Sequence, residues 1–89
     1  ITFESVARDW HASNRKWSKS HSARVLKSLE DNLFDAIGKR NIADLKTQDL
    51  LKPLKAVEMS GRLEVAARLQ QRTTSIMRFA VQSGLIDYN

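Results

Sequence analysis

The chain has 89 residues, 42% of them hydrophobic and 28% charged, a balance typical of one ordinary globular domain rather than of a disordered segment. It has no cysteine, which excludes disulfides and thiolate metal sites and fits a cytoplasmic protein. No signal peptide and no membrane-spanning apolar run are visible in these residues. Fifteen Lys and Arg against ten Asp and Glu leave a net charge of +5, which favours a polyanionic partner.

Helix signals dominate the chain, since only three glycines and one proline are available for turns, and we predict an all-α fold. The first helix begins after Thr2, whose hydroxyl can cap it, with Glu4 near the positive end of the helix dipole. Ser13 and Asn14 mark its end. Trp17 continues the apolar stripe, so packing in the core is favoured over stacking on a nucleic-acid base, an alternative that stays open. The stripe comprises Phe3, Val6, Ala7, Trp10 and Trp17.

A second helix is predicted from Lys19 to about Leu33, with Ser18 as its N-cap. The free backbone N–H groups of its first turn favour a phosphate. His21 lies in that turn, and we interpret it either as a capping or phosphate contact or as a plain surface residue. The apolar stripe consists of Val25, Leu26, Leu29 and Leu33. The polar residues of the first turn and the opposite face are Lys19, Ser20, His21, Arg24 and Lys27.

Residues 34–46 are interpreted as a connection in which Gly38 makes the turn. The basic residues Lys39, Arg40 and Lys46 are more typical of a solvated loop than of a phosphate contact. Four apolar side chains of this stretch are expected to point inward: Phe34, Ile37, Ile42 and Leu45.

Thr47 is predicted to cap a third helix. Pro53 lies beyond its first turn and forfeits one backbone hydrogen bond, so either a separate turn precedes Lys52 or the helix bends there. Ser60 and Gly61 end the helix, and the junction with the next helix is so short that we expect the two axes to cross at a large angle. The apolar stripe comprises Leu50, Leu51, Leu54 and Val57.

The longest predicted helix lies between Gly61 and Gly84, with no glycine or proline inside it, and its twenty-odd residues make a rod of roughly 30 Å. Gly84 stands where a left-handed C-cap is expected, with Leu85 as its apolar contact. One side of the rod is apolar and comprises Val65, Ala66, Leu69, Ile76, Met77 and Ala80. The other side is polar and comprises Arg68, Gln71, Arg72, Ser75, Arg78 and Gln82.

No catalytic constellation is recognisable, neither a glycine-rich phosphate loop nor a supported Ser/His/Asp arrangement. Tyr88 has no cluster of arginine and histidine to activate it, so we do not expect it to be a nucleophile. Two lone histidines, His11 and His21, do not predict a metal site. We expect a binding domain without catalytic residues, metal or cofactor. The binding signal is the pair of polar faces on the second and fourth helices, because arginine, glutamine and serine are residues that contact phosphates and base edges.

Five pieces of the sequence, in order and spacing, resemble the central, core-site-binding domain of phage-type integrases, the tyrosine recombinases of prophages and integrative islands. These are FESVARDW at 3–10, WSKSHSARVLKSLE at 17–30, IG at 37–38, ADLKTQDLL at 43–51, and EVAARLQQRTTSIMRFAVQSGLIDYN at 64–89. The most specific parts are the Trp-Ser-x-x-His opening of the second helix and the Ala-x-x-Ser-Gly-Leu-Ile-x-x-Asn close. Asp35 stands where many relatives have proline, a departure expected to touch only a turn.

The resemblance implies a four-helix, SAM-like orthogonal bundle over residues 1–89, excised from a longer integrase whose arm-binding and catalytic domains lie elsewhere. It implies that double-stranded DNA is clamped between this domain and the catalytic domain of the same chain, with contacts to other integrase protomers, no membrane, and a place in the bacterial cytoplasm at the nucleoid. The family's catalytic arginines, histidine and tyrosine belong to the catalytic domain. The DNA-binding positions that it implies are Lys19, His21, Arg24 and Lys27 on the second helix and Arg68, Gln71, Arg72, Ser75 and Arg78 on the fourth.

The function expected from this resemblance is DNA binding that positions a core recombination half-site for site-specific integration or excision. Two other interpretations stay open. One is a helical protein-interaction module whose basic face meets an acidic protein, and the other is an RNA-binding helical domain that uses Trp17 and the arginines.

Overall fold

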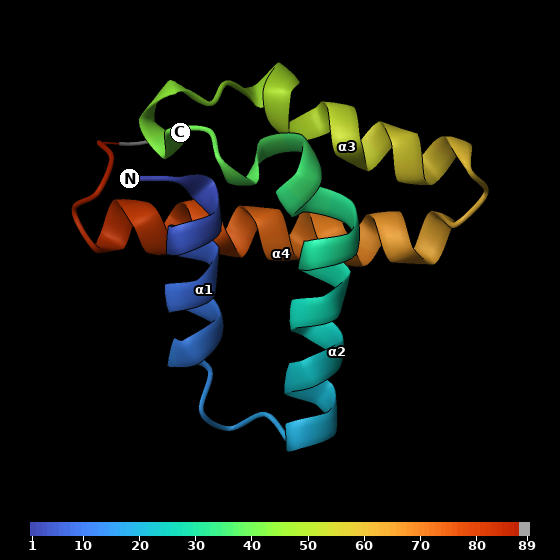
Figure 1. Cartoon of the computed structure of the whole chain (residues 1–89), viewed down its shortest axis with the longest axis horizontal. Coiled ribbons are helices and arrows are strands. Elements are labelled where there is room, and N and C mark those ends of the chain that lie inside the picture. Colours follow the sequence, from blue (N-terminus) through green and yellow to red (C-terminus); the bar gives the residue numbers. More distant parts are fainter. Residues whose placement is uncertain (88–89) are drawn as a thin grey trace.

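The computed structural model describes residues 1–87, so the expectations for Tyr88 and Asn89 lie outside this range. Within it the chain is helical, as predicted, apart from its connections and an isolated β-bridge between Thr2 and Asn41. The elements are α1 (Phe3–Ser13), α2 (Lys19–Leu29), the π-helical η1 (Glu30–Gly38), the 3₁₀ turn η2 (Ile42–Asp44), α3 (Thr47–Met59) and α4 (Leu63–Gln82) (Figure 1).

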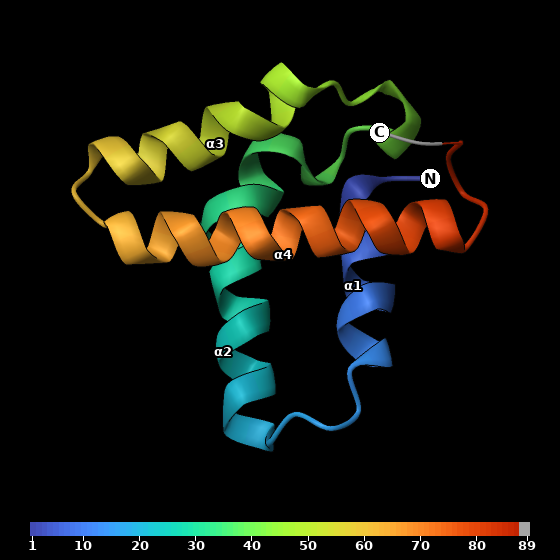
Figure 2. The ribbon, with the colours of Figure 1, turned by 180° about the vertical axis from the view of Figure 1, so that it is seen from behind.

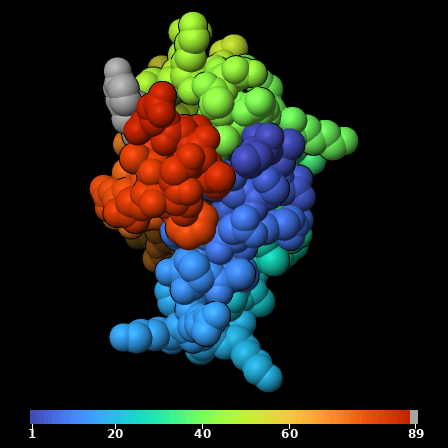
Figure 3. Space-filling view, turned by 90° about the vertical axis from the view of Figure 1, so that its left-hand side faces the viewer, coloured from blue at the N-terminus to red at the C-terminus, as the bar shows by residue number. Residues whose placement is uncertain are grey.

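The helices form an orthogonal bundle in which α1 and α2 stand across the direction of α3 and α4 (Figures 1 and 2). The connection between α1 and α2 forms the narrow end of the molecule, from which long side chains project (Figure 3). α3 runs antiparallel alongside α4, so the prediction that their axes cross at a large angle is wrong. Gly61 permits this return, because its φ of +90° lets the chain reverse between Met59 and Leu63.

The buried apolar side chains form one cluster to which every element contributes. Phe3 of α1 meets Phe34 of η1 edge to face, with the ring centroids 6.5 Å apart. Thr73 is a buried residue of α4 that the apolar pattern did not single out. Its hydroxyl donates a hydrogen bond to the carbonyl of Leu69 over 2.7 Å, so its polar atom is satisfied inside the core. The largest fully buried side chains are Phe3, Val6, Val25, Leu29, Leu33, Ile42, Leu69, Ile76 and Met77.

The first two helices begin where capping residues were predicted. The Thr2 hydroxyl accepts a hydrogen bond from the backbone N–H of Ser5 over 3.1 Å, and the Ser18 hydroxyl accepts one from the N–H of His21 over 3.2 Å. Asn14 follows the last residue of α1, as expected. Each cap satisfies a backbone donor that the helix itself cannot pair, and so it fixes the residue at which the helix begins.

The start of α3 differs from the prediction, because Lys46 rather than Thr47 is the N-cap residue. The backbone N–H of Lys46 donates to the carboxylate of Asp49 over 2.9 Å. This hydrogen bond, together with the positive charge of Arg40, lowers the pKa of Asp49. Of the two alternatives predicted at Pro53, the separate turn before Lys52 is wrong, since α3 runs continuously through Pro53 from residue 47 to residue 59.

The prediction that residues 34–46 form a connection is wrong for the first part of this range. The helix passes without a break from α2 into η1, because Leu33, Phe34 and Ile37 keep a helical spacing and are buried in the core. Gly38 is the last residue of η1 and does not have the positive φ of a left-handed turn. Its Cα approaches other atoms closely, since a Cβ there would lie 3.1 Å from the Cβ of Phe34 and 3.2 Å from a carboxylate oxygen of Glu4. Asp35 therefore occupies a helix and not a turn.

α4 ends in a Schellman motif centred on Gly84, as predicted. The N–H of Leu85 donates to the carbonyl of Ala80 over 2.9 Å, and that of Gly84 to Val81 over 3.0 Å. Because Gly84 has φ +75°, we expect Gly84→Ala to lower the free energy of unfolding by about 1–2 kcal/mol in urea denaturation. Ser83→Ala, at φ −86°, is the matched control and should cost less than about 0.5 kcal/mol. Equal losses in the two variants would contradict this account.

Candidate nucleic-acid interface

A groove of about 600 Å³ lies between α2 and α4. It brings together residues that are far apart in the sequence, and four of the nine predicted DNA-binding residues line it. The lining residues are His21, Arg24 and Ser28 from α2 and Val65, Arg68 and Arg72 from α4. The groove thus joins the polar faces of two helices, which the sequence predicted only separately.

Arg72 forms the polar link between the two walls of this groove. It is half-buried, and its Nη1 donates a hydrogen bond to the hydroxyl of Ser28 over 2.8 Å. Burial, and then the nearby positive charge of Arg68, lower the pKa of the Arg72 guanidinium. Arginine nevertheless stays protonated at neutral pH, because its ordinary pKa is far above that range. The groove therefore holds a guanidinium that is partly withdrawn from water.

The arginines of the groove have no carboxylate partner among the residues that the structure describes. Within residues 1–87 the ion pairs join Arg8 to Glu4 and Glu30, Lys27 to Asp31 and Arg40 to Asp49, and none involves a groove arginine. In the described part of the chain, no acidic residue lines the groove either. A hollow with three arginines and no internal counter-charge attracts anions and concentrates them near its surface.

His21 is held at one end of the groove by aromatic packing. Its ring meets the ring of Trp17 edge to face at 5.2 Å between centroids, and Trp17 meets Trp10 in the same way at 5.6 Å. Trp17 is half-buried and packs against the core, in line with the favoured interpretation of this residue. The Nε2 atom of His11 lies 2.8 Å from the carbonyl oxygen of Ser22, which ties α1 to α2 beside this cluster. The edge of the groove is thus built on packed rings.

Five predicted site residues do not line the groove. Lys19 is exposed in the first turn of α2, and Lys27 is an exposed partner of Asp31 at 3.4 Å, a pairing of little energetic weight. On α4, successive residues are rotated by about 100°, so Gln71 and Arg78 point roughly 60–80° away from Arg68, on the side opposite Arg72. The remaining predicted site residue of α4 outside the groove is Ser75, which is half-buried.

Ser28 is a groove residue that the sequence analysis missed. A signal for it existed, because Ser28 follows Arg24 by four residues and therefore shares its helix face. A serine within a helical pattern is easily taken for a neutral surface residue. Its role depends on contact with Arg72, 44 positions later in the chain, and helical periodicity carries no information about that contact.

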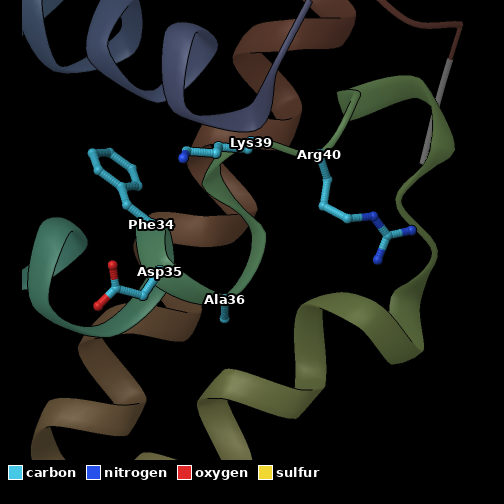
Figure 4. Close-up of a pocket in the computed structure, with 5 residues that line it drawn as sticks. All are labelled: Phe34, Asp35, Ala36, Lys39 and Arg40. Atoms are coloured by element: carbon cyan, nitrogen blue, oxygen red, sulfur yellow. The ribbon is translucent and has the colours of Figure 1, made fainter.

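A second hollow, of about 350 Å³, lies on η1 and the residues after it (Figure 4). Figure 4 shows the side chains of Lys39 and Arg40 diverging from neighbouring backbone positions. Arg40 is already paired with Asp49 at 3.6 Å, and Asp35 adds a negative charge to the lining. This hollow is less suited to an anion than the groove between α2 and α4, because its positive charge is largely matched by carboxylates.

No helix in the described range combines the length and the apolarity that a membrane crossing requires. Over residues 1–87, no three histidine or carboxylate side chains gather closely enough to hold a metal ion.

Comparison with known proteins identifies relatives that match this chain over nearly its whole length. The family model of the phage integrase central domain matches residues 3–89. The chain is 77% identical to IntB of Escherichia coli (strain K12) and 56% identical to the integrase of Enterobacteria phage P4, in each case over 99% of its own length. It spans only about a fifth of the length of these relatives, 22% and 20% respectively.

Solved structures agree with the sequence comparisons. The NMR structure of fragment 87–196 of the phage integrase IntS of E. coli matches with a TM-score of 0.91 at 25% identity, over 99% of this chain and 75% of that one. Fold, family model and sequence identity therefore point to the same conclusion. The chain belongs to the phage integrase central domain family.

Proposed function

We propose that this domain binds double-stranded DNA across α2 and α4, mainly through phosphates, and so helps to position a core recombination half-site. The observation that carries the proposal is the groove in which Arg24, Arg68 and Arg72 gather without a carboxylate partner from residues 1–87. Membership of the phage integrase central domain family supports the same function.

The chemistry of the groove suits a nucleic-acid backbone. Duplex DNA presents about one negative charge per 1.7 Å of its axis, and arginine binds phosphate oxygens with two parallel N–H donors. His21 lines the groove near the start of α2, where the backbone N–H groups that Ser18 does not cap can add further donors. Gln71, Ser75 and Arg78 continue the polar face of α4 beyond the groove, so a bound duplex can extend over them.

We further propose that residues 1–89 act as one core-type DNA-binding domain of a longer integrase. Its relatives IntB and the phage P4 integrase are several times longer, and the site-specific integration and excision of DNA would need a catalytic domain elsewhere in such a chain. In that arrangement the catalytic domain closes the other side of the duplex, and neighbouring protomers meet in a synaptic complex. The protein would then work in the bacterial cytoplasm, at the nucleoid.

A proton–nitrogen NMR titration with a short DNA duplex, at low and then at moderate salt, tests the proposal. We expect shifts confined to residues 19–28 of α2 and 65–78 of α4. They should weaken as salt rises, because each phosphate contact releases counterions and contributes about 0.9 to the slope of log affinity against log salt. An absence of shifts even at low salt would refute DNA binding by this domain alone.

Two competitors in the same titration separate the other interpretations. If an RNA duplex displaces the DNA at equal concentration, the preferred ligand of the domain is RNA and not DNA. Polyglutamate that shifts the same residues more strongly than DNA would indicate a protein-interaction module. We do not expect polyglutamate to win, because the groove arginines match the spaced phosphates of a duplex better than flexible carboxylates. Arginines on a helix face fit the backbone of either nucleic acid, so the competition itself decides between DNA and RNA, and membership of the integrase family favours DNA.

A further inference from the structure

Arg72 differs from every other arginine of residues 1–87, because it alone is half-buried while the rest are exposed. Its guanidinium has a single hydrogen-bond partner in that range, the hydroxyl of Ser28 across the groove at 2.8 Å. Arg24 and Arg68, which line the same groove, have no hydrogen bonds from their guanidinium groups to residues of the described range. One cation of the groove is therefore held in place, and its neighbours are not.

The Ser28 hydroxyl is itself fixed. It donates its hydrogen to the carbonyl of Val25 over 2.8 Å, which leaves an oxygen lone pair to accept the hydrogen bond from Arg72. The side chain of Asn32 donates to the carbonyl of Ser28 over 2.9 Å and adds a further hydrogen bond at the same turn of the helix. Both hydrogen-bonding functions of the Ser28 hydroxyl are thus used within the protein.

We propose that Ser28 is a positioning residue that presets the guanidinium of Arg72 to grip one DNA phosphate. Only Nη1 of Arg72 is engaged by Ser28, so the edge formed by Nε and Nη2 remains free for two parallel hydrogen bonds to a phosphate. Ser28 touches no DNA in this proposal and acts through Arg72. The inference rests on the proposed DNA binding. It adds that Ser28 orders one cation of the groove before the DNA binds.

The physical advantage is entropic. A free arginine side chain must give up its rotamer freedom when it binds, whereas Arg72 has lost most of that freedom on folding. Arg72 is also partly buried beside the positive charge of Arg68. A bound phosphate would therefore neutralise a charge that no carboxylate of residues 1–87 pairs with. Arg24 and Arg68 then add long-range attraction and adaptable contacts.

The first test needs no DNA. Nitrogen-15 NMR of the arginine side chains should show slowed rotation about the guanidinium bonds of Arg72 in the free wild-type domain, and fast rotation for Arg24 and Arg68. Ser28→Ala should abolish this difference, and Ser28→Thr, which keeps the hydroxyl, should restore it. Fast rotation of the Arg72 group in the wild type would overturn the proposal.

The second test measures affinity for a random-sequence DNA duplex at several salt concentrations. We expect Ser28→Ala to bind about three- to tenfold more weakly, the cost of ordering one long side chain, with an unchanged salt slope because no charge is lost. Arg72→Gln should bind more weakly and also reduce the slope by about 0.9, since it removes one phosphate contact. Arg72→Lys should keep the slope and lose affinity, because its point charge cannot form the paired contact.

Thr74→Ala is the matched control. Thr74 donates to the carbonyl of Gln70 over 3.0 Å, a local helix bond like that of Ser28, but it lies outside the groove. It should bind DNA as the wild type does, and Ser28→Ala should have the same melting temperature as this control. If the wild type binds and Ser28→Ala binds equally well, the positioning role is wrong while DNA binding stands. If the wild type itself does not bind the duplex, the proposed function fails and the positioning role fails with it.

Discussion

Replacing both Arg68 and Arg72 by glutamate is expected to weaken binding to a DNA duplex at least about a hundredfold, since like charges placed against each other cost several kcal/mol. The double variant removes two of the three groove arginines and puts two carboxylates in their place. Fluorescence anisotropy with a labelled duplex at low salt measures the loss. Circular dichroism should show unchanged helix content, because neither residue belongs to the apolar cluster. Binding that survives the double substitution would show that the DNA face lies elsewhere.

A charge-matched control separates the place of the charges from their number. Lys52→Glu/Lys55→Glu makes the same change in net charge on α3, where both lysines are exposed and neither lines the groove. We expect only a few-fold loss of affinity at low salt, caused by weaker long-range attraction and screened away as salt rises. An equal loss in both double variants would mean that net charge alone drives binding.

The largest expected effect on stability is that of Leu69→Ala in the middle of α4. Leu69 is 0% exposed, and truncation of such a leucine typically lowers the free energy of unfolding by about 2–5 kcal/mol. Because a domain of this size has only about 5–15 kcal/mol in total, the variant should melt about 10–20 °C lower than the wild type. Thermal and urea unfolding, followed by circular dichroism, measure both quantities.

The control for this substitution is Leu63→Ala on the same helix. Leu63 is 64% exposed at the start of α4, so the same loss of side-chain atoms should change stability by less than about 0.5 kcal/mol. The comparison isolates burial from helix propensity. If the two variants melted together, α4 would not be packed on the core as described.

Local physical chemistry in the sequence determined where most helices start and stop. The hydroxyls of Thr2 and Ser18 cap α1 and α2, and Gly84 closes α4 with a positive φ, because these effects depend on a few consecutive residues. The prediction of a cap at Thr47 was wrong by one residue, since the side chain of Asp49 satisfies the N–H of Lys46 instead. The apolar stripes predicted the core in the same way, from spacing alone.

The sequence could also place basic residues on the polar faces of α2 and α4, but only the tertiary structure decided which of them share one groove. Helical periodicity gives the face of a residue and not the neighbour that this face meets. Gly38 illustrates the same limit, because its tight fit against Glu4 and Phe34 depends on the packing of η1 on α1 and not on a turn. The antiparallel return of α3 along α4 likewise depends on the geometry at Gly61 and on the burial of both apolar stripes in one core. The hydrogen bond from Arg72 to Ser28 joins residues 44 positions apart, and only the folded chain brings them within 2.8 Å.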